Sequence, residues 1–403
     1  MSEWRKLPLK EITVKIGSGS TPTGGSGAYK ETGVSLIRSQ NVLDFSFTNN
    51  GLAFIDEEQA HALRNVIVEP QDVLLNITGD SVARCCSAPR EWLPARVNQH
   101  VAIIRAHPKH LDSLFLKYSL ISIKDELLSL SEIGGTRNAL TKSMLENLKL
   151  FVPSVIEQKA IASVLSSLDD KIDLLHRQNK TLESMANTLF RQWFIEDAHI
   201  HWTEKKLSSF GRIICGKTPS KKNSLYFGND VPFLKIPDMH GKVFVFKSTD
   251  NLSFAGEHSQ SKKTIPPGSI CVSCIATVGL VCITDVSMQT NQQINSIIPN
   301  KEYYKYFLYL LMKSMGDELN NLASGGTATL NLNTGDFSNI TFLSPSENEL
   351  KIFHQSISSL FDKLKLNSKQ INIIENLRDT LLPKLMSGEV RVQDAEEAIA
   401  SVV

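Results

Sequence analysis

One segment of the sequence, from Gly211 to Thr218, matches the G-x-x-x-x-G-K-[ST] pattern of phosphate-binding loops. In such a loop a buried strand leads into the glycines and a helix follows, so that the first amides of the helix bind phosphate. Here the preceding residues are polar, Ile213 and Ile214 occupy the loop interior, and Pro219 follows without a helical pattern. A nucleotide-binding protein that uses Lys217 is therefore an alternative that the surrounding sequence does not favour.

Two of the six cysteines, Cys271 and Cys274, have the C-x-x-C spacing of some metal and redox sites. A zinc site needs a second pair of ligands with similar spacing, and the residues around these cysteines are typical of an apolar strand. We expect no metal site here, and reduced thiols in a long chain with so few cysteines. The sequence also lacks G-x-S-x-G, H-E-x-x-H and methyltransferase N-P-P-Y motifs, which predicts a chain without catalytic residues or a cofactor of its own.

Polar and basic residues in predicted loops could instead bind DNA. Amide, guanidinium and hydroxyl groups hydrogen-bond to base edges, whereas lysines contact phosphates. Between Lys205 and Lys222 six basic residues occur without an acidic one. By residue type alone, the candidates for DNA contact are Ser39, Gln40, Asn41, Thr78, Asp80, Ser81, Thr136, Arg137, Asn138, Lys217, Thr218, Lys221, Lys222, Lys235 and Thr327. The alternative is that these segments are ordinary turns without a ligand.

The overall charge is nearly balanced, with 43 Lys and Arg against 42 Asp and Glu, a net charge of +1. A near-neutral total argues against a chain that wraps nucleic acid through charge alone. No apolar stretch approaches the roughly 20 residues of a membrane helix, and the first residues contain no apolar signal segment. We therefore expect a soluble, cytoplasmic protein.

The elements that must position these residues occur twice along the chain. Gly19-Ser20-Thr21-Pro22 matches Gly216-Lys217-Thr218-Pro219, and the two prolines are 197 positions apart. Asn98-Gln99-His100 matches Asn291-Gln292-Gln293 at a spacing of 193, and Asp170-Lys171 matches Asp362-Lys363 at 192. The falling spacing indicates a short deletion in the second copy, so the chain is one unit written twice.

Each copy begins with short β-branched runs broken by turn residues and ends in a long segment almost without Gly or Pro. This pattern predicts globular α+β domains at 1–152 and 201–344. It predicts a long helix at 153–200 and a second long helix with a C-terminal tail at 345–403. The domain order is therefore globule, helix, globule, helix.

Both predicted helices carry apolar residues at alternating spacings of four and three, which is the coiled-coil pattern. The first series is Ile161, Leu165, Leu168, Ile172, Leu175, Asn179, Leu182, Ala186, Leu189 and Trp193, and the second runs from Phe353 to Leu385 through Asn367 and Arg378. Tandem units are easily related by a two-fold axis, which favours an antiparallel pair. End-to-end alignment places Asn179 opposite Asn367, and we predict that the two amides meet and fix the register. The alternative is that each Asn lies at a solvated edge. Pro383 should end or kink the second helix near Leu382.

The combination of these features resembles the specificity (S) subunits of type I restriction–modification systems. The resemblance covers essentially the whole chain. It rests on the tandem repeat, the GxTP openings at Gly19 and Gly216, and the strand segments PQDVLLNITGDS and PPGSICVSCIAT. The segments VNQHVAII and TNQQINSII, the Gly-Gly-Thr turns, and the helix signatures PSVIEQKAIASVLSSLDDKID and LRDTLLPKLMSGEV complete the set.

The resemblance implies two target recognition domains, related by a pseudo-two-fold axis, that each read one half of a split DNA target. A long antiparallel two-helix coiled coil would set the unread spacer and bind two methyltransferase (M) subunits, and restriction and translocase (R) subunits would join them. S-adenosylmethionine, ATP and Mg would belong to those partners, and this chain would be non-catalytic. A coiled-coil scaffold without a role in DNA binding is a further alternative. Because recognition domains of this family diverge freely, the resemblance assigns no individual DNA contact.

Overall fold

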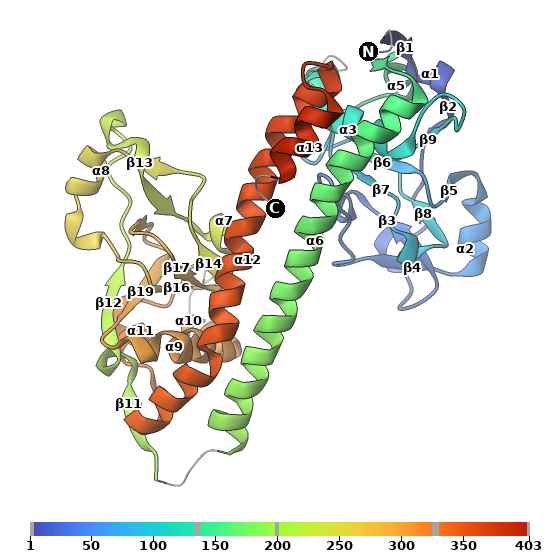
Figure 1. Cartoon of the computed structure of the whole chain (residues 1–403). Helices are drawn as coiled ribbons and strands as arrows, with labels where there is room; N and C mark the ends of the chain where they lie inside the picture. The colour runs from blue at the N-terminus through green and yellow to red at the C-terminus, as the bar shows by residue number, and fades with distance from the viewer. Residues whose placement is uncertain (1–3, 133–137, 198–200, 325–329, 401–403) are drawn as a thin grey trace. The chain divides into compact units, whose positions relative to one another are not determined.

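The computed structural model of the chain describes residues 4–132, 138–197, 201–324 and 330–400. The chain forms two compact units: unit 1 is Met1–Asp173 with Asn372–Val403, and unit 2 is Leu174–Ile371. Each unit combines a globular domain with parts of both long helices, α6 (Val155–Arg191) and α12 (Glu347–Ser387) (Figure 1). The unit limits therefore fall inside the helices, whereas the predicted domain limits at 152 and 344 fall close to where the helices begin.

The globular domain of unit 1 is built on two sheets and a two-stranded ribbon. The first sheet has the order β2-β9-β6-β7 and consists of β2 (Thr13–Ser18), β6 (Val73–Asn76), β7 (Cys85–Ser87) and β9 (Val101–Ala106). The second has the order β4-β3-β8-β5 and consists of β3 (Val34–Ile37), β4 (Ala53–Ile55), β5 (Ile67–Val68) and β8 (Ala95–Val97). The ribbon pairs β1 (Arg5–Pro8) with β10 (Lys149–Val152). The helices are α1 (Leu9–Ile12), α2 (Glu57–Ala62), α3 (Ser113–Ser122), α4 (Lys124–Glu132), α5 (Lys142–Asn147) and, near the C-terminus, α13 (Val392–Ala400).

Unit 2 repeats this plan. Its larger sheet has the order β12-β19-β16-β17-β14, from β12 (Gly211–Cys215), β14 (Phe244–Val245), β16 (Ile270–Ser273), β17 (Val281–Thr284) and β19 (Ile294–Pro299). The smaller sheet joins β13 (Phe227–Leu234), β15 (Asn251–Leu252) and β18 (Gln289–Thr290), and the ribbon pairs β11 (Thr203–Lys206) with β20 (Thr341–Ser344). The helices are α7 (Ile236–Met239), α8 (Phe254–His258), α9 (Lys305–Ser314), α10 (Gly316–Ala323) and α11 (Thr334–Ser338). The predicted mixture of helices and sheets is confirmed.

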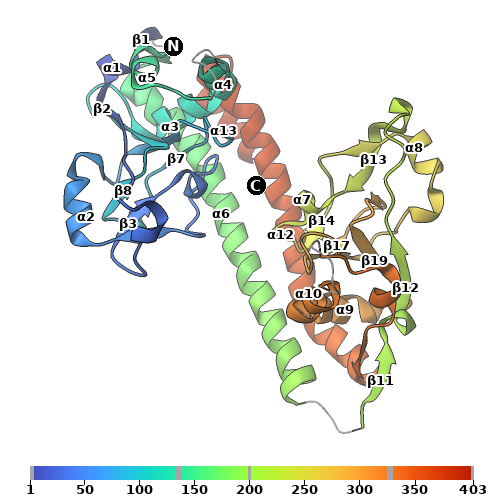
Figure 2. The ribbon, with the colours of Figure 1, turned by 180° about the vertical axis from the view of Figure 1, so that it is seen from behind.

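The two long helices pack side by side within each unit (Figures 1 and 2). Most seam residues of the predicted series are buried; Leu165 and Ile374, for example, are fully enclosed. In unit 1, Asp169 of α6 contacts Arg378 of α12, and in unit 2, Gln178 contacts Asn367. Residue numbers rise along α6 as those of their partners fall along α12, so the helices run antiparallel, as predicted.

The two seam asparagines lie in the same layer of unit 2, but their amides are not hydrogen-bonded to each other. Asn179 Nδ2 donates to Ser368 Oγ at 3.2 Å, and Asn367 Nδ2 donates to Gln178 Oε1 at 3.2 Å. Each amide thus bonds to the neighbour of the other. Asn367 is fully buried, and the Oδ1 atoms of both asparagines are enclosed without a hydrogen-bond partner. Whether this polar layer sets the register stays a prediction.

Of the two outcomes predicted at Pro383, an end of the helix near Leu382 is wrong, because α12 continues through Pro383 to Ser387; a kink there stays a prediction. A proline removes one backbone donor from a helix. The residues on either side remain buried, among them Leu381, Leu382 and Leu385. Their packing holds the last turn of the helix in place despite the missing hydrogen bond. At the other helix, a π-helical turn at Gln192–Glu196 extends α6.

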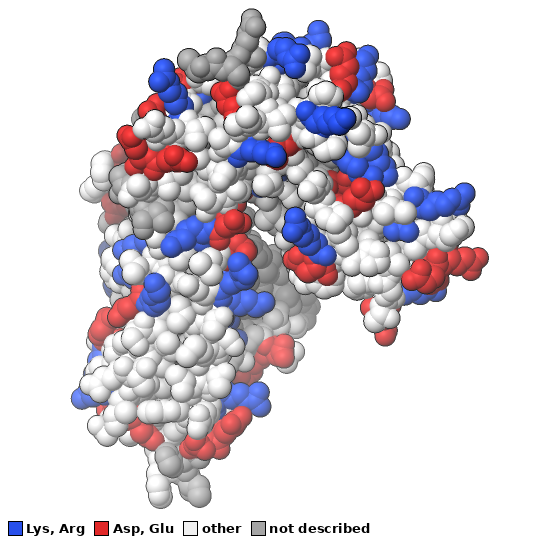
Figure 3. Space-filling model, turned by 45° about the vertical axis from the view of Figure 1, so that its right-hand side comes forward, with Lys and Arg blue, Asp and Glu red and all other residues white. Residues whose placement is uncertain are grey.

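Charge is distributed without a dominant sign on the face drawn in Figure 3, where Lys and Arg alternate with Asp and Glu. This agrees with the net charge of +1. None of the helices in the described part of the chain combines the length and the apolar character that a membrane span requires.

Candidate nucleic-acid interface

Several predicted loops of unit 1 meet at one edge of the β2-β9-β6-β7 sheet. The sheet is antiparallel, and Ser18 at the end of β2 pairs with Ala102, while Asn76 at the end of β6 pairs with Val101. The ends of β2 and β6 and the start of β9 therefore lie at the same edge. We call this edge, with the loops that leave it, the polar edge of unit 1.

The GxTP opening is held against this edge by close backbone contact. A Cβ atom on Gly19 would lie 1.7 Å from the carbonyl oxygen of Val97, so only glycine fits there. Thr21 then donates a hydrogen bond from Oγ1 to Gln99 Oε1. Next to Gln99, His100 Nδ1 lies 2.5 Å from Thr78 Oγ1. A row of polar side chains, Thr21, Gln99, His100 and Thr78, therefore runs along the polar edge.

Unit 2 has an equivalent polar edge with different side chains. A Cβ atom on Gly216 would lie 2.1 Å from the carbonyl oxygen of Asn291. Thr218 Oγ1 donates to Gln292 Oε1 at 2.7 Å, as Thr21 does to Gln99. The position of His100 is taken by Gln293. The two polar edges share a backbone arrangement and differ in the groups that they present.

This arrangement gives no support to a phosphate-binding loop. The amide of Gly216 donates to the carbonyl of Ile294, and that of Lys217 donates to the carbonyl of Thr290, so neither is free to bind phosphate. The next helical element is a single 3₁₀ turn at Ser224–Tyr226, far too short to supply a helix N-terminus for a nucleotide. Lys217 is an exposed lysine of the polar edge.

The loop after β3, residues 39–51, contains one buried side chain that holds the loop and other side chains that are accessible to a ligand. Asn41 is fully buried, its Oδ1 accepts from the Arg38 amide at 3.0 Å, and its Nδ2 donates to the carbonyls of Thr48 and Asn50. The side-chain amide of Asn41 holds the loop, which makes Asn41 the least accessible of the three candidates in this loop. Gln40 is exposed and donates to the Gly51 carbonyl at 3.1 Å, and Ser39 is half-buried beside it.

The turn between β6 and β7 completes the polar edge of unit 1. The amide of Gly79 donates to the carbonyl of Asn138 at 3.3 Å, and Thr78 pairs with Ala139 across an isolated bridge. The fold therefore brings the candidates Thr78 and Asn138, with exposed Asp80 and half-buried Ser81, to the same place as His100. Three further candidates, Thr136, Arg137 and Thr327, lie outside the described residues.

The basic run of unit 2 does not form one patch. Lys217, Lys221 and Lys222 are exposed after the end of β12. Lys205 and Lys206 lie before that strand, in the β11-β20 ribbon, where Lys206 Nζ donates to Asn339 Oδ1 at 3.0 Å. Lys235 Nζ is 2.5 Å from Asp250 Oδ2. Three lysines thus remain at the polar edge, and Lys235 is paired with a carboxylate.

The cysteines are structural residues of the sheets. Cys271 and Cys282 face each other across β16 and β17, and both are fully buried. Burial raises the pKa of the Cys86 thiol to about 12, so that thiol stays protonated. In the part of the chain that the structure describes, no three His, Cys, Asp or Glu side chains are grouped to hold a metal ion.

Sequence reasoning missed Thr21, Gln99 and His100 as members of this edge. Their signal was present in the repeated Asn-Gln segments, which the comparison of the two copies had aligned. The alignment of the two copies could not show that the segment before β9 contacts the GxTP opening.

The type I restriction modification DNA specificity domain matches residues 1–184 and 199–376. The chain belongs to this family. It is 40% identical over 331 residues to the type I restriction enzyme HindI specificity subunit of Haemophilus influenzae, covering 64% of this chain and 72% of that protein. It is 28% identical to the MjaIX specificity subunit of Methanocaldococcus jannaschii, covering 97% of this chain and 94% of that protein. The crystal structure of a type I S subunit from M. genitalium matches with a TM-score of 0.59 at 16% identity and covers 95% of this chain and 96% of that one, which shows a shared fold.

The protein is thus a DNA specificity subunit of the type I restriction–modification class. Specificity subunits of this family are in general not catalytic. The comparisons give no support to the nucleotide-binding or scaffold alternatives.

The long helices of the specificity subunit expose apolar side chains in unit 2. Leu174 and Met185 on α6 and Ile352 and Leu366 on α12 are between 43% and 58% exposed. Leu174, Leu182, Arg177 and Lys363 line a shallow hollow on this surface. We call these residues the helix surface of unit 2.

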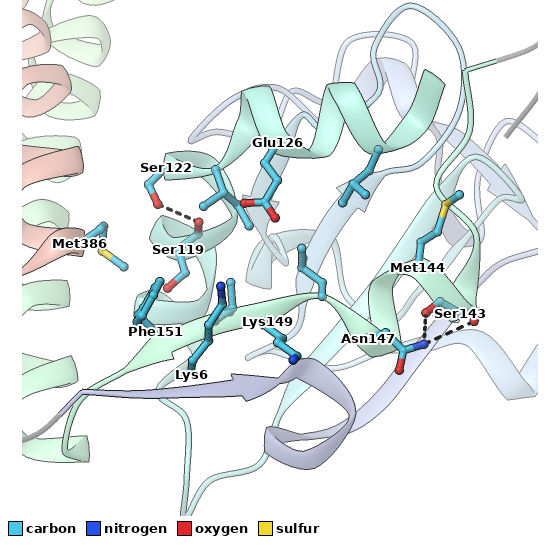
Figure 4. A pocket seen from close by; sticks show the side chains of 14 residues that line it. Lys6, Ser119, Ser122, Glu126, Ser143, Met144, Asn147, Lys149, Phe151 and Met386 are labelled. Carbon is cyan, nitrogen blue, oxygen red and sulfur yellow. Dashed lines mark hydrogen bonds between the residues drawn. The ribbon is translucent and has the colours of Figure 1, made fainter. Parts of the chain in front are cut away.

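A separate cavity of about 540 Å³ lies in unit 1 of the specificity subunit, between α3, α4, α5 and the β1-β10 ribbon (Figure 4). Ser119, Leu150 and Met386 line it. In unit 2 the corresponding positions, 192 residues away, carry the larger Leu311, Phe342 and Phe194. Phe194 packs there with its ring centre 4.6 Å from that of Phe353. At these positions the smaller side chains of unit 1 leave more space than those of unit 2.

Proposed function

We propose that the polar edge of each unit reads one half of a split DNA target. The observation that carries this proposal is the repetition of one backbone arrangement with different side chains. Thr21–Gln99 and Thr218–Gln292 are equivalent pairs, but His100 in unit 1 corresponds to Gln293 in unit 2. Side chains at base edges determine which sequence is bound, so two such edges would select two different half-targets.

The polar edges are supplied with the groups that such contacts need. The 39–51 loop adjoins the polar edge of unit 1, because Asn76 Nδ2 at the end of β6 donates to the Ser39 carbonyl at 2.9 Å. Gln40, Gln99 and His100 in unit 1 offer hydrogen-bond donors and acceptors, and Lys217, Lys221 and Lys222 in unit 2 offer charges for phosphates. Asp80 and Thr218 are further candidates for contact, as the sequence predicted.

An exchange of recognition domains tests this proposal. Residues 1–152 would be replaced by the corresponding domain of another specificity subunit, and the chain would be assembled with its methyltransferase subunits. We expect gel-shift competition to show a change in one half of the preferred target only. Binding whose sequence preference ignores the exchange would contradict the proposal and favour a passive scaffold.

We further propose that the antiparallel helices set the unread spacer and bind two methyltransferase subunits, with restriction and translocase subunits joining the complex. A helix of about 40 residues is roughly 60 Å long, compared with about 34 Å for one turn of DNA. S-adenosylmethionine, ATP and Mg would be bound by those partners, and this chain would contribute no catalytic group. The complex would act in the cytoplasm.

The helix surface of unit 2 supports partner binding, and the same helices also expose Ile156 and Ile373 in unit 1. Exposed apolar patches on a protein surface mark interaction sites. We expect Leu366→Asp to prevent co-purification with the methyltransferase subunits. The matched control is Leu225→Asp, because Leu225 is 75% exposed outside the long helices. Equal co-purification of both variants would contradict partner binding at this surface.

A further inference from the structure

Arg378 is a buried charge at a seam position of α12. Its side chain is 10% exposed. Its Nη1 donates to Asp169 Oδ1 at 3.1 Å, and its Nε donates to Asp379 Oδ1 at 3.0 Å. Its guanidinium carbon lies 3.6 Å from the centre of the Phe45 ring. Arg378 therefore connects both long helices of unit 1 to the 39–51 loop.

Asp169 extends this network into the globular domain. Its Oδ2 accepts hydrogen bonds from Lys117 Nζ at 2.9 Å and from Tyr118 Oη at 2.6 Å. Burial, reinforced by the Asp169 carboxylate, raises the pKa of Tyr118, so that the phenol stays protonated as a donor. Because four polar groups converge here in a poorly solvated place, their geometry is strongly constrained.

Unit 2 shows that the fold does not require this network. At the four corresponding positions, 192 residues away, unit 2 has Phe361 for Asp169, Tyr309 for Lys117, Leu310 for Tyr118 and Ala186 for Arg378. All four are buried, and Phe361 stacks on Tyr306 with ring centres 4.1 Å apart. Buried ion pairs are often no more stabilising than apolar residues of similar volume. Unit 2 also joins α6 to α9 by a polar contact, since Tyr309 Oη donates to Glu183 Oε1 at 2.8 Å. What distinguishes unit 1 is that its charged set includes Arg378 and reaches the 39–51 loop through Phe45.

Phe45 has an unusual backbone conformation. Its φ is +67°, a left-handed conformation that is unfavourable for a bulky residue, so the surroundings must hold it. The Phe45 amide donates to the Cys85 carbonyl at 3.0 Å, and the ring is covered by Arg378. The same loop carries Gln40, which is bonded to the Gly51 carbonyl. A change in how Phe45 sits would displace the exposed groups of this loop.

We propose that Arg378 is a positioning residue that determines the selectivity of unit 1 for its half-target, by fixing Phe45 and with it the 39–51 loop. Arg378 itself touches no DNA. This inference rests on the proposed function, since it takes the 39–51 loop as part of the surface that reads DNA. It places a determinant of DNA selectivity on α12, more than 300 residues beyond the loop in the sequence.

The test compares Arg378→Met, Arg378→Lys and Phe45→Leu in the complex with methyltransferase subunits. Arg378→Met removes the charge and the ring contact, whereas Arg378→Lys keeps a cation near Asp169 and loses the planar stacking. Phe45→Leu removes the ring without altering either helix. Binding is measured to duplexes that carry a base change in one half-target or in the other.

We expect Arg378→Met and Phe45→Leu to reduce discrimination at one half-target about tenfold, the size of a lost buried cation–π contact. Discrimination at the other half should stay unchanged, and the double variant should show little further loss, because the two residues act through one contact. Arg378→Lys should lie between Arg378→Met and the unmodified protein. The control Thr380→Ala truncates an exposed side chain on the same helix, whose hydroxyl donates to the Asn376 carbonyl, and should preserve selectivity.

Unchanged discrimination in Phe45→Leu, or an equal loss at both halves, would overturn the inference, since the 39–51 loop belongs to unit 1 alone. If Arg378→Met fails to assemble, Phe45→Leu decides between these outcomes. A failure of the proposed function is distinguishable, because the unmodified complex would then show no sequence preference in either half.

Discussion

The glycine of the first GxTP opening provides a sharp test of how the polar edge is built. In Gly19→Ala the new Cβ would lie 1.7 Å from the Val97 carbonyl oxygen and 2.7 Å from that of Asn98. Both neighbours are backbone atoms that cannot rotate away, so the opening must move by more than about 1 Å. Overpacking of this kind costs about 3 kcal/mol. In a unit of this size that corresponds to a fall in melting temperature of about 6–12 °C.

The matched control is Gly17→Ala in β2, two residues before Gly19, because a Cβ there meets nothing within 4 Å. Alanine in a strand is favoured over glycine by roughly 0.5–1 kcal/mol, so this variant should be neutral or slightly more stable. Calorimetry of the full-length chain measures both. Displacement of the opening should also weaken selectivity at one half-target, since Thr21 would lose Gln99. Gly19→Ala that melts within about 1 °C of Gly17→Ala would refute the close-contact explanation.

Four further predictions concern single positions. Lys221→Ala should weaken DNA binding for all sequences, and the slope of log binding constant against log salt concentration should fall by about one. The control Lys206→Ala, at the β11-β20 ribbon, should change neither quantity in the same salt titration. Ser119→Leu should fill part of the unit 1 cavity and raise the melting temperature by a few degrees, and a decrease would mean that the cavity cannot accept the side chain. Asn367→Leu should raise the melting temperature, because it removes an amide whose Oδ1 is buried without a hydrogen-bond partner. If the polar layer sets the register of the two helices, cross-linking of this variant should also detect helices in shifted registers. Hydrogen bonds from Lys301, Tyr303 and Tyr304 lower the pKa of Glu347 to about 2. The stabilising effect of the Glu347 carboxylate is therefore complete above about pH 4.5 and disappears as the pH falls toward 2. In this range the melting temperature of Glu347→Gln should depend less steeply on pH than that of the unmodified protein.

The helices could be predicted closely because their signal is periodic and local. The seam series from Ile161 to Trp193 follows from sequence spacing alone, and the repeat adds the second helix. Pro383 was misjudged because a local rule about backbone donors was applied where burial of Leu381 and Leu385 outweighs one missing hydrogen bond.

The polar edge could be predicted only in part, because it depends on contacts between segments far apart in the sequence. Residue type nominated Thr78 and Asn138, which lie at this edge, but it also nominated Asn41, whose amide is used internally. Whether an asparagine reads a base or holds a turn depends on burial, which composition does not reveal.

The contacts of Arg378 on α12 could not be predicted from the sequence either, for the same reason. The spacing placed it in the seam, where an apolar residue is expected, but nothing local indicates that its partners are Asp169 and Phe45. Comparison of the two copies was the most informative sequence evidence, because it separates what the fold requires from what one copy alone carries.

The most direct test of the central claim is single-molecule methylome sequencing of a host that carries the genes of this specificity subunit and its methyltransferase. We predict methylation within a split target whose two halves differ in sequence and are separated by an unread spacer of fixed length. A continuous target, or a methylation pattern that stays the same when this chain is exchanged for another specificity subunit, would contradict the account.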